Sequence, residues 1–536
     1  MRTKLLLAAL ALAGPLHAAA PAARDTTPAD EARRVAAKID EIVAAGWARA
    51  GARPAAPATD AAFLRRASLD IAGKVPPVND VRKFLGDPSP EKRLQAIERL
   101  LDSPGYVNHQ TTLWLDLLLP EANADFQKRF LMMGMHQWLR KQFAANTPYD
   151  KMVRELLTLP MTGGNNRNQF FEYYQGGGEA SPMGFYLAKL GKPEELAASV
   201  GRLFLGVRLE CAQCHDHPFG KWKREEFWSQ AAFFAGMKGP RGDNFFGQPI
   251  TEVSDRRELT IPNTDRVAQA RFLDGKQPRW KFKVSARTSL ADWMTAKENP
   301  FFAKAIVNRM WAHFFGVGLV EPVDDLVDDN PASHPELLNL LAKEFVEHDF
   351  DLKFLVRAIC ASKAYQLSSA QSGPPAEPRL FSRMAVKGLT SEQLFESLCV
   401  ATGHRDNVPL QQRLFSFGNN SPRTQFADLF GEQEKKIEYH TSIPQALTMM
   451  NNKLVVDATH PDRGEVLGAV CSSGFMSPAG KIEALFLAAL SRKPRPEEAA
   501  RFLKYVENGG VNDNPKKALA DVFWALLNST EFRFNH

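Results

Sequence analysis

Residues 196–219 read LAASVGRLFLGVRLECAQCHDHPF and combine two patterns. The first half carries apolar residues at helical spacing, namely Leu196, Val200, Leu203, Phe204 and Val207. This spacing predicts a helix with one buried face. The second half is a cluster of cysteines and histidines. We therefore expect a helix that packs into a helical core and presents this cluster at its end.

Helical patterns broken by Pro and Gly continue along the chain in both directions. The segment 239–286 differs, because Gly, Pro and short alternating runs such as Trp280–Val284 are typical of strands and turns. The predicted fold class is mainly α, with two helical units joined by a small β-containing connector. The predicted divisions are a signal peptide at 1–19, an N-terminal helix and Pro/Ala linker at 20–59, a first helical unit at 60–237, the connector at 238–286 and a second helical unit at 287–536.

The N-terminus has the order of a secretory signal: basic residues, an apolar run from Leu5 to Leu12, and small residues at Ala18 and Ala19. The run is too short to cross a bilayer. We therefore expect a secreted protein, periplasmic or extracellular, without direct membrane insertion. The net charge of +6 is spread over 67 basic and 61 acidic residues without a basic stripe, so we expect no nucleic-acid partner.

The cysteine pattern in the centre of the chain is Cys-x-x-Cys-His, the attachment signature of haem c. In that interpretation Cys211 and Cys214 bond the porphyrin and His215 binds the iron. With His217 the same segment offers four ligands for zinc, copper or non-haem iron. A disulfide between the two cysteines is a third interpretation. The other cysteines lie apart: Cys360 and Cys399 have the spacing of buried helical faces, and Cys471 is compatible with a free or a paired state.

A second group of polar residues lies on a helix predicted to begin near Pro300, where Arg309 and His313 share a face with apolar residues. The functional interpretation is that Arg309 binds a haem propionate or a substrate carboxylate and His313 binds metal or moves protons. The structural interpretation is that Arg309 pairs with Asp324 or Asp325. If the two units share a site, we expect this face to approach Cys211–His217 and the acidic segment to border it.

The second unit also has a marked helix start. Ser333 and Glu336 have capping-box spacing before an apolar stripe. The acidic residues from Glu321 to Asp329 could supply oxygen ligands for Ca²⁺ but lack the spacing of a calcium loop. An acidic connector exposed to solvent is the favoured interpretation.

Several separated segments resemble one known family. They are Phe63–Arg66, Trp114–Asp116, Thr147–Asp150, Phe204–Val207 and Cys211–Phe219, and then Leu290–Trp293, Asn299–Ala303, Asn308–Gly316 and Leu526–Phe532. The chain is similar to the planctomycete-type secreted cytochrome-like domain of unknown function (family number 1549), followed by its C-terminal companion domain (family number 1553). The sequence departs from the family at Leu113 and Gly220, where a His and an Asp are frequent, and it has no additional N-terminal cytochrome-like module.

Three hypotheses of function follow. The first is an exported haem-binding or metal-binding protein that transfers electrons to or from a redox or secreted partner protein. The second is a non-haem metal enzyme that uses the Cys/His cluster on extracellular substrates. The third is a non-catalytic secreted interaction module. His217 separates the second from the first, because a haem needs only the Cys-x-x-Cys-His part of the cluster.

Overall fold

The computed structural model describes residues 27–124, 126–129, 131–161, 180–216, 222–239, 250–370, 377–406, 423 and 449–536. The predicted signal peptide and His217 lie outside these residues. The described chain is mainly α-helical, as predicted, with only two-stranded sheets. No helix among the described segments is long and apolar enough to cross a membrane.

The N-terminal part is a series of helices with clear start and stop signals. Thr27, Thr59 and Ser103 cap helix N-termini through their side chains, because a hydroxyl oxygen satisfies an amide that has no partner within the helix. Gly73 ends α2 in the left-handed conformation at φ 73°. The helices are α1 (Pro28–Ala50), α2 (Asp60–Ala72), α3 (Val78–Gly86), α4 (Lys92–Leu101), α5 (Pro104–Leu118), α6 (Glu121–Ala124), α7 (Phe126–Arg129), α8 (Met132–Ala144) and α9 (Tyr149–Leu157).

The segment around the cysteine cluster has shorter elements. They are α11 (Met183–Ala188), α12 (Pro193–Val200), the π-helical turn η1 (Gly201–Leu205), the 3₁₀ turn η2 (Glu210–Gln213), α13 (Arg224–Ala231) and the 3₁₀ turn η3 (Ala232–Phe234). All five apolar residues of the predicted helix face are buried. The helix prediction is confirmed, with η1 widening its last turn.

The connector contains two small antiparallel sheets. One pairs β1 (Met237–Lys238) with β2 (Thr251–Glu252), and the other pairs β3 (Glu258–Thr260) with β4 (Val267–Gln269). The predicted small β-containing connector is confirmed, although its alternating run Trp280–Val284 is not one of the strands. That run forms a turn in which Lys283 has φ 58° and Phe282 is 86% exposed, so its alternation has no neighbouring strand to pair with.

The C-terminal half is again helical. Its elements are α14 (Ala286–Met294), α15 (Phe302–Phe315), α16 (Pro335–Glu347), α17 (Leu352–Ala361), η4 (Pro378–Leu380), β5 (Lys387–Gly388), α18 (Ser391–Thr402), α22 (Lys453–Ala458), α23 (Glu465–Ser472), α24 (Pro478–Leu490), α25 (Pro496–Glu507), η5 (Gly510–Asn512), α26 (Pro515–Leu527), α27 (Thr530–Arg533) and β6 (Phe534–Asn535). The predicted capping box at Ser333 is wrong, because His334 is the N-cap residue of α16 and its side chain accepts no hydrogen bond from the first turn.

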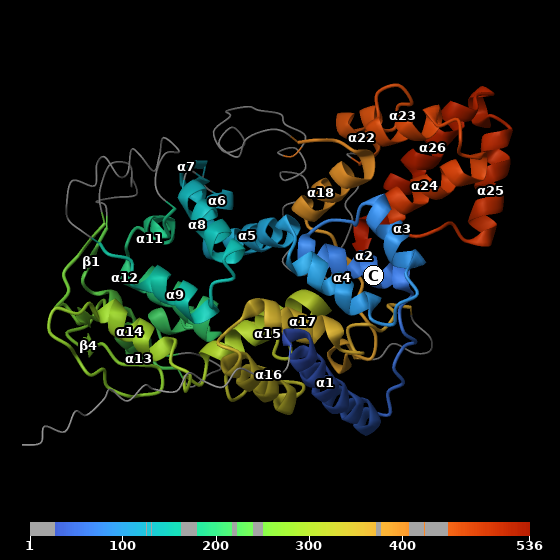
Figure 1. Ribbon diagram of the computed structural model, residues 1–536. Coiled ribbons are helices and arrows are strands. Elements are labelled where there is room, and N and C mark those ends of the chain that lie inside the picture. Colours follow the sequence, from blue (N-terminus) through green and yellow to red (C-terminus); the bar gives the residue numbers. More distant parts are fainter. Residues whose placement is uncertain are drawn as a thin grey trace, which may run out of the picture.

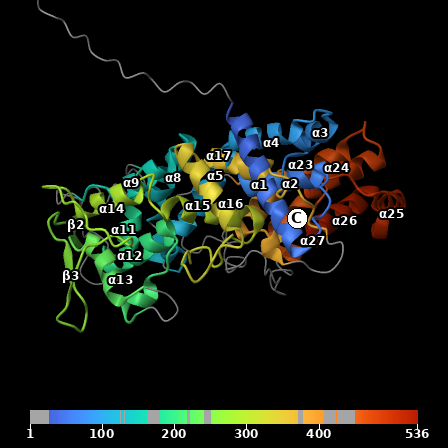
Figure 2. The ribbon, with the colours of Figure 1, turned by 90° about the horizontal axis from the view of Figure 1, so that it is seen from below.

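The strands of the connector and the helices α22–α26 lie at opposite ends of the molecule, with α15–α17 between them (Figures 1 and 2). α1 lies along α16 and α17. Two hydrophobic cores result. The first contains buried residues from 32 to 384 together with Leu487, and the second contains residues from 389 to 532 together with Leu69 and Val75. Helix α2 therefore contributes to both cores.

Candidate metal-binding turn

The cysteine cluster is held in place by the turn that precedes it. After η1, Gly206 adopts the left-handed conformation at φ 65°, and its carbonyl accepts a hydrogen bond from the amide of Leu326 at 2.8 Å. A Cβ at position 206 would lie 2.6 Å from Leu326 Cδ1 and 3.1 Å from Ala305 Cβ. The close approach requires glycine, and it packs α15 and the acidic segment against the start of the cluster.

The two cysteines belong to the 3₁₀ turn η2 and the residue that follows it. Because residues three apart eclipse in a 3₁₀ helix, Cys211 and Cys214 point to the same side. Both are exposed and both are free thiols, whereas Ala212 between them is buried. The disulfide interpretation is therefore not what the structure shows. The Gln213 carbonyl on the inner side accepts a hydrogen bond from Trp228 Nε1 at 3.1 Å, which fixes the turn to α13.

His215 is oriented by its own neighbour. Its Nδ1 lies 2.7 Å from the carbonyl oxygen of Asp216, and its ring is exposed. A carbonyl can only accept, so Nδ1 carries the proton and Nε2 is the nitrogen with a lone pair, the form that binds metals. Asp216 is held in turn, because its Oδ1 accepts from the amide of Arg224 at 2.9 Å.

Arg309 contacts the segment that leads into the cysteine cluster. It does not form the predicted ion pair with Asp324 or Asp325. Its Nη2 donates to the carbonyl of Arg202 in η1 at 3.3 Å. Asp324 instead forms an ion pair with Arg208 at 2.6 Å. Burial lowers the pKa of Arg309, and the nearby charge of Asp324 opposes this effect. The structural interpretation of Arg309 thus needs a correction: its guanidinium donates to a backbone carbonyl, and Asp324 pairs with Arg208 instead.

His313, one turn beyond Arg309, contacts a different element. Its Nε2 lies 2.9 Å from the carbonyl oxygen of Asp70 in α2, and its ring centroid lies 5.7 Å from that of His109. His109 is buried and packs against Gly73. Among the described residues, no group of three or more His, Cys, Asp or Glu side chains converges to hold a metal ion. This holds for the acidic segment as well.

Sequence patterns did not reveal a buried polar network next to His313. Asp70 accepts hydrogen bonds from Lys387 Nζ at 2.6 Å, Tyr365 Oη at 2.8 Å and Asn535 Nδ2 at 2.8 Å. Lys387 Nζ also donates to the carbonyls of His313 and Phe314. Burial lowers the pKa of Lys387, and the Asp70 carboxylate opposes that shift. The available signal in the sequence was an Asp between the apolar residues Leu69 and Ile71 of α2.

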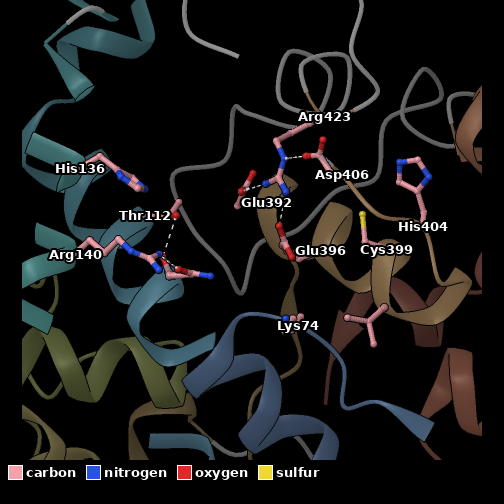
Figure 3. A pocket seen from close by; sticks show the side chains of 12 residues that line it. Lys74, Thr112, His136, Arg140, Glu392, Glu396, Cys399, His404, Asp406 and Arg423 are labelled. Atoms are coloured by element: carbon pink, nitrogen blue, oxygen red, sulfur yellow. Dashed lines mark hydrogen bonds and ion pairs between the residues drawn. The ribbon is translucent and has the colours of Figure 1, made fainter. Parts of the chain in front are cut away.

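The core predictions for the remaining thiols are confirmed in part. Cys360 is buried, and Cys471 is buried and free. Cys399 is only half-buried, because one side of α18 faces a cavity that α5 and α8 also line (Figure 3).

Comparisons with known protein families divide the chain into two successive domains. Residues 38–239 match the PSCyt2 model, described as a protein of unknown function (DUF1549), and residues 286–506 match the PSD1 model, also described as a protein of unknown function (DUF1553). The chain is a PSCyt2–PSD1 protein. No curated protein and no solved structure matches it. The cysteine turn lies in the PSCyt2 domain, and α15 with Arg309 and His313 lies in the PSD1 domain.

The turn of the PSCyt2 domain can be compared with what a haem or an ion requires. In haem c the thiols bond the porphyrin and only the imidazole binds iron, so three ligands need not converge on one point. Two outward thiols on one side and a His215 ring with Nε2 available fit this requirement. Leu209 and Ala212 fill the inner side of the turn. A group held here would therefore lie on the outer face of the domain.

Proposed function

We propose that this PSCyt2–PSD1 protein is an exported metal-binding protein of the redox class, with its metal centre at the Cys211–His217 turn. The observation that carries the proposal is the joint presentation of two free, exposed thiols on one side of η2 and of the His215 ring. An outward-facing centre suits electron exchange with a partner protein, because such exchange needs the centre close to the surface of contact. The leader-like N-terminus supports export, since haem attachment to cysteines takes place outside the cytoplasm.

Haem c is the leading form of this centre. When bound, it supplies one-electron transfer at iron. Cys211 and Cys214 would hold the porphyrin through thioethers, and His215 would supply the proximal nitrogen. The carbonyl of Asp216 keeps the His215 proton on Nδ1, and the Arg224 amide keeps Asp216 in place. Arg224 therefore supports the orientation of the ligand from the first turn of α13.

A non-haem ion is the second candidate. Exposed thiols can ionise and bind zinc, copper or iron, and His217 adds a second imidazole two residues beyond His215. This form needs the turn to close so that the ligands converge. A role in catalysis on extracellular substrates would then require an open coordination position.

The test is to express the full chain with its leader in two hosts, one that matures c-type cytochromes and one that does not. A Soret band and covalent haem stain from the first host support the haem form. Stoichiometric zinc, copper or iron in haem-free protein from the second host supports the ion form. The double variant Cys211→Ala/Cys214→Ala should lose either centre, and Cys471→Ala should keep it. Folded protein free of metal from both hosts would refute the proposal.

A further inference from the structure

The segment between β4 and α14 contains a turn with an exposed aromatic side chain. This connector turn spans residues 281–284, and the amide of Val284 donates to the carbonyl of Lys281 at 3.3 Å to close it. Phe282 in the turn is 86% exposed. The two elements that flank the segment, β4 and α14, lie at the end of the molecule opposite to α22–α26 (Figure 1). The connector turn therefore holds a phenylalanine out into solvent.

Positive charge surrounds the connector turn. From Gly275 to Ala291 the sequence has no Asp or Glu but five basic residues. Two of the five form ion pairs, with Asp274 and with Glu252. The other three are exposed and form no ion pair within the described part of the chain; they are Arg279, Lys281 and Lys283. The near balance of charge over the whole chain conceals this local excess.

The connector turn is fixed at both ends. On one side, the ring centroid of Trp280 lies 6.2 Å from that of Phe233, and the guanidinium of Arg257 lies 4.3 Å from the same Trp280 centroid. On the other side, Ser285 caps α14 and its hydroxyl donates to Glu252. A turn held in this way loses little conformational entropy when a partner contacts it.

A single exposed apolar side chain is common on proteins, so the surrounding charge decides what it means. Phe475, in the loop before α24, is 87% exposed, but no basic residue lies within five positions of it. Phe282 has a lysine on each side, and the Lys283 ammonium lies 5.4 Å from its ring centroid. An apolar side chain among cations matches a bilayer of anionic lipids, because the phosphates attract the cations while the ring enters the interface.

We propose that the connector turn is a peripheral docking site for a membrane surface that contains anionic lipids. Phe282 enters the interfacial region of the bilayer, and Arg279, Lys281 and Lys283 contact the lipid phosphates. One aromatic ring and three cations give weak and reversible attachment, of the order of that of a single acyl chain. This contact needs no helix across the bilayer. It is also independent of the metal centre, because none of these residues belongs to the cysteine turn.

The test is co-sedimentation of the full chain with vesicles of phosphatidylglycerol and phosphatidylcholine in equal parts, compared with vesicles of phosphatidylcholine alone. We expect binding to the anionic vesicles that weakens with added salt, because salt screens exposed charges. Phe282→Ser should bind about tenfold more weakly, because the ring no longer leaves water. Lys281→Gln/Lys283→Gln should also lose at least about tenfold, because two cations no longer meet the lipid phosphates. Equal binding to both kinds of vesicle, or binding to neither, would overturn the proposal.

Two matched controls lie at the opposite end of the molecule. Phe475→Ser removes an equally exposed aromatic ring, and Lys516→Gln/Lys517→Gln removes two exposed lysines from the first turn of α26. Both controls should bind the anionic vesicles as the wild type does. Control variants as impaired as the variants of the connector turn would overturn the proposal, because binding would then follow overall charge and hydrophobicity.

The variant Lys283→Gly separates the loss of charge from the loss of folding. Lys283 has φ 58°, a backbone conformation that glycine adopts without strain. The variant should therefore be at least as stable as the wild type in urea unfolding and should still bind the anionic vesicles more weakly. Wild-type binding by Lys283→Gly would overturn the proposal. Lysine variants that lose binding while Phe282→Ser keeps it would overturn it in favour of a site for soluble polyanions.

Discussion

At the scale of single residues, the Asp70 carboxylate is a buried charge that accepts hydrogen bonds from three side chains. Its side chain is 2% exposed and the Lys387 side chain 4%. Removing two charges from water is costly, and the pair is maintained here by hydrogen bonds to Tyr365, Asn535 and two backbone carbonyls of α15. The network is therefore more sensitive to the loss of one partner than to the loss of both.

We predict that Lys387→Met lowers the free energy of unfolding by about 3–5 kcal/mol, because it leaves a buried carboxylate without its cation. The double variant Asp70→Asn/Lys387→Met should be less destabilised than Lys387→Met alone. Urea unfolding followed by circular dichroism measures both. The exposed pair Lys297–Asp349 gives the control. Its Lys297→Met variant should change stability by less than about 1 kcal/mol. A Lys387→Met protein as stable as the wild type would contradict this account.

The loss of protein stability at acidic pH should depend on Glu344. Burial disfavours its charge, but hydrogen bonds from Arg34 and Lys38 outweigh this and lower its pKa to about 2 from an ordinary 4.5. A lowered pKa in the folded state gives stabilisation that is complete above the unfolded value of 4.5 and is lost as the pH falls towards 2.

We therefore predict that Glu344→Gln destabilises the protein at pH 6 and that variant and wild type converge as the pH approaches 2. Urea midpoints measured between these pH values test this. Glu347→Gln, at an exposed position of the same helix, should follow the wild-type curve. A constant offset between Glu344→Gln and wild type across the whole range would show that the charge of Glu344 is not the cause.

At the scale of elements, the turn after η1 couples the cysteine cluster to the PSD1 domain. Gly206 combines a left-handed backbone with contacts to Leu326 and Ala305. Gly51, at the end of α1, has nearly the same φ of 63° but no atom within 4 Å of its position for a Cβ. An alanine at position 51 would therefore meet only the strain of the left-handed backbone, whereas an alanine at position 206 would also clash with Leu326 and Ala305.

We predict that Gly51→Ala costs about 1–2 kcal/mol of stability, the usual cost of the left-handed conformation for an L-residue. Gly206→Ala should cost clearly more and should also reduce the metal or haem content of the purified protein. Thermal unfolding and elemental analysis measure the two effects. Equal stability of the two variants would mean that the approach of Leu326 to the turn is not needed.

At the scale of the whole molecule, the last residues of the chain join the two cores. Arg65 in α2 is 1% exposed and donates to the carbonyls of Ala489, Glu531 and Phe532. Burial lowers its pKa to about 10. β6 pairs with β5 and carries Asn535, a partner of Asp70. Helix α2 thus depends on residues more than 400 positions away for the acceptors of Arg65 and for one donor to Asp70.

We predict that deleting residues 530–536 destabilises the whole protein by at least about 3 kcal/mol, because Phe532 leaves the core and Arg65 loses two acceptors. Arg65→Met should recover part of this loss in the shortened chain, although it destabilises the full-length one. Denaturant unfolding followed by tryptophan fluorescence and circular dichroism tests whether both cores are affected together. A shortened chain with wild-type stability would contradict the idea that the C-terminal residues join the two cores.

Local patterns in the sequence determined the helical class, the start and burial of α15, the apolar face before the cysteines, and the identity of the motif. Each depends on spacing within a few turns, which the chain carries wherever it folds. The same local reasoning was wrong at Ser333, because His334 and not Ser333 is the N-cap residue of α16.

Only the tertiary structure decided which charged groups meet. Asp324 pairs with Arg208 and not Arg309, Asp70 with Lys387, and Arg423 with carboxylates of α18. The outward direction of the two thiols was decided in the same way. The physical reason is that a long side chain selects its partner by distance in three dimensions, and those distances follow from how helices pack. These distances cannot be read from the spacing of residues along the chain.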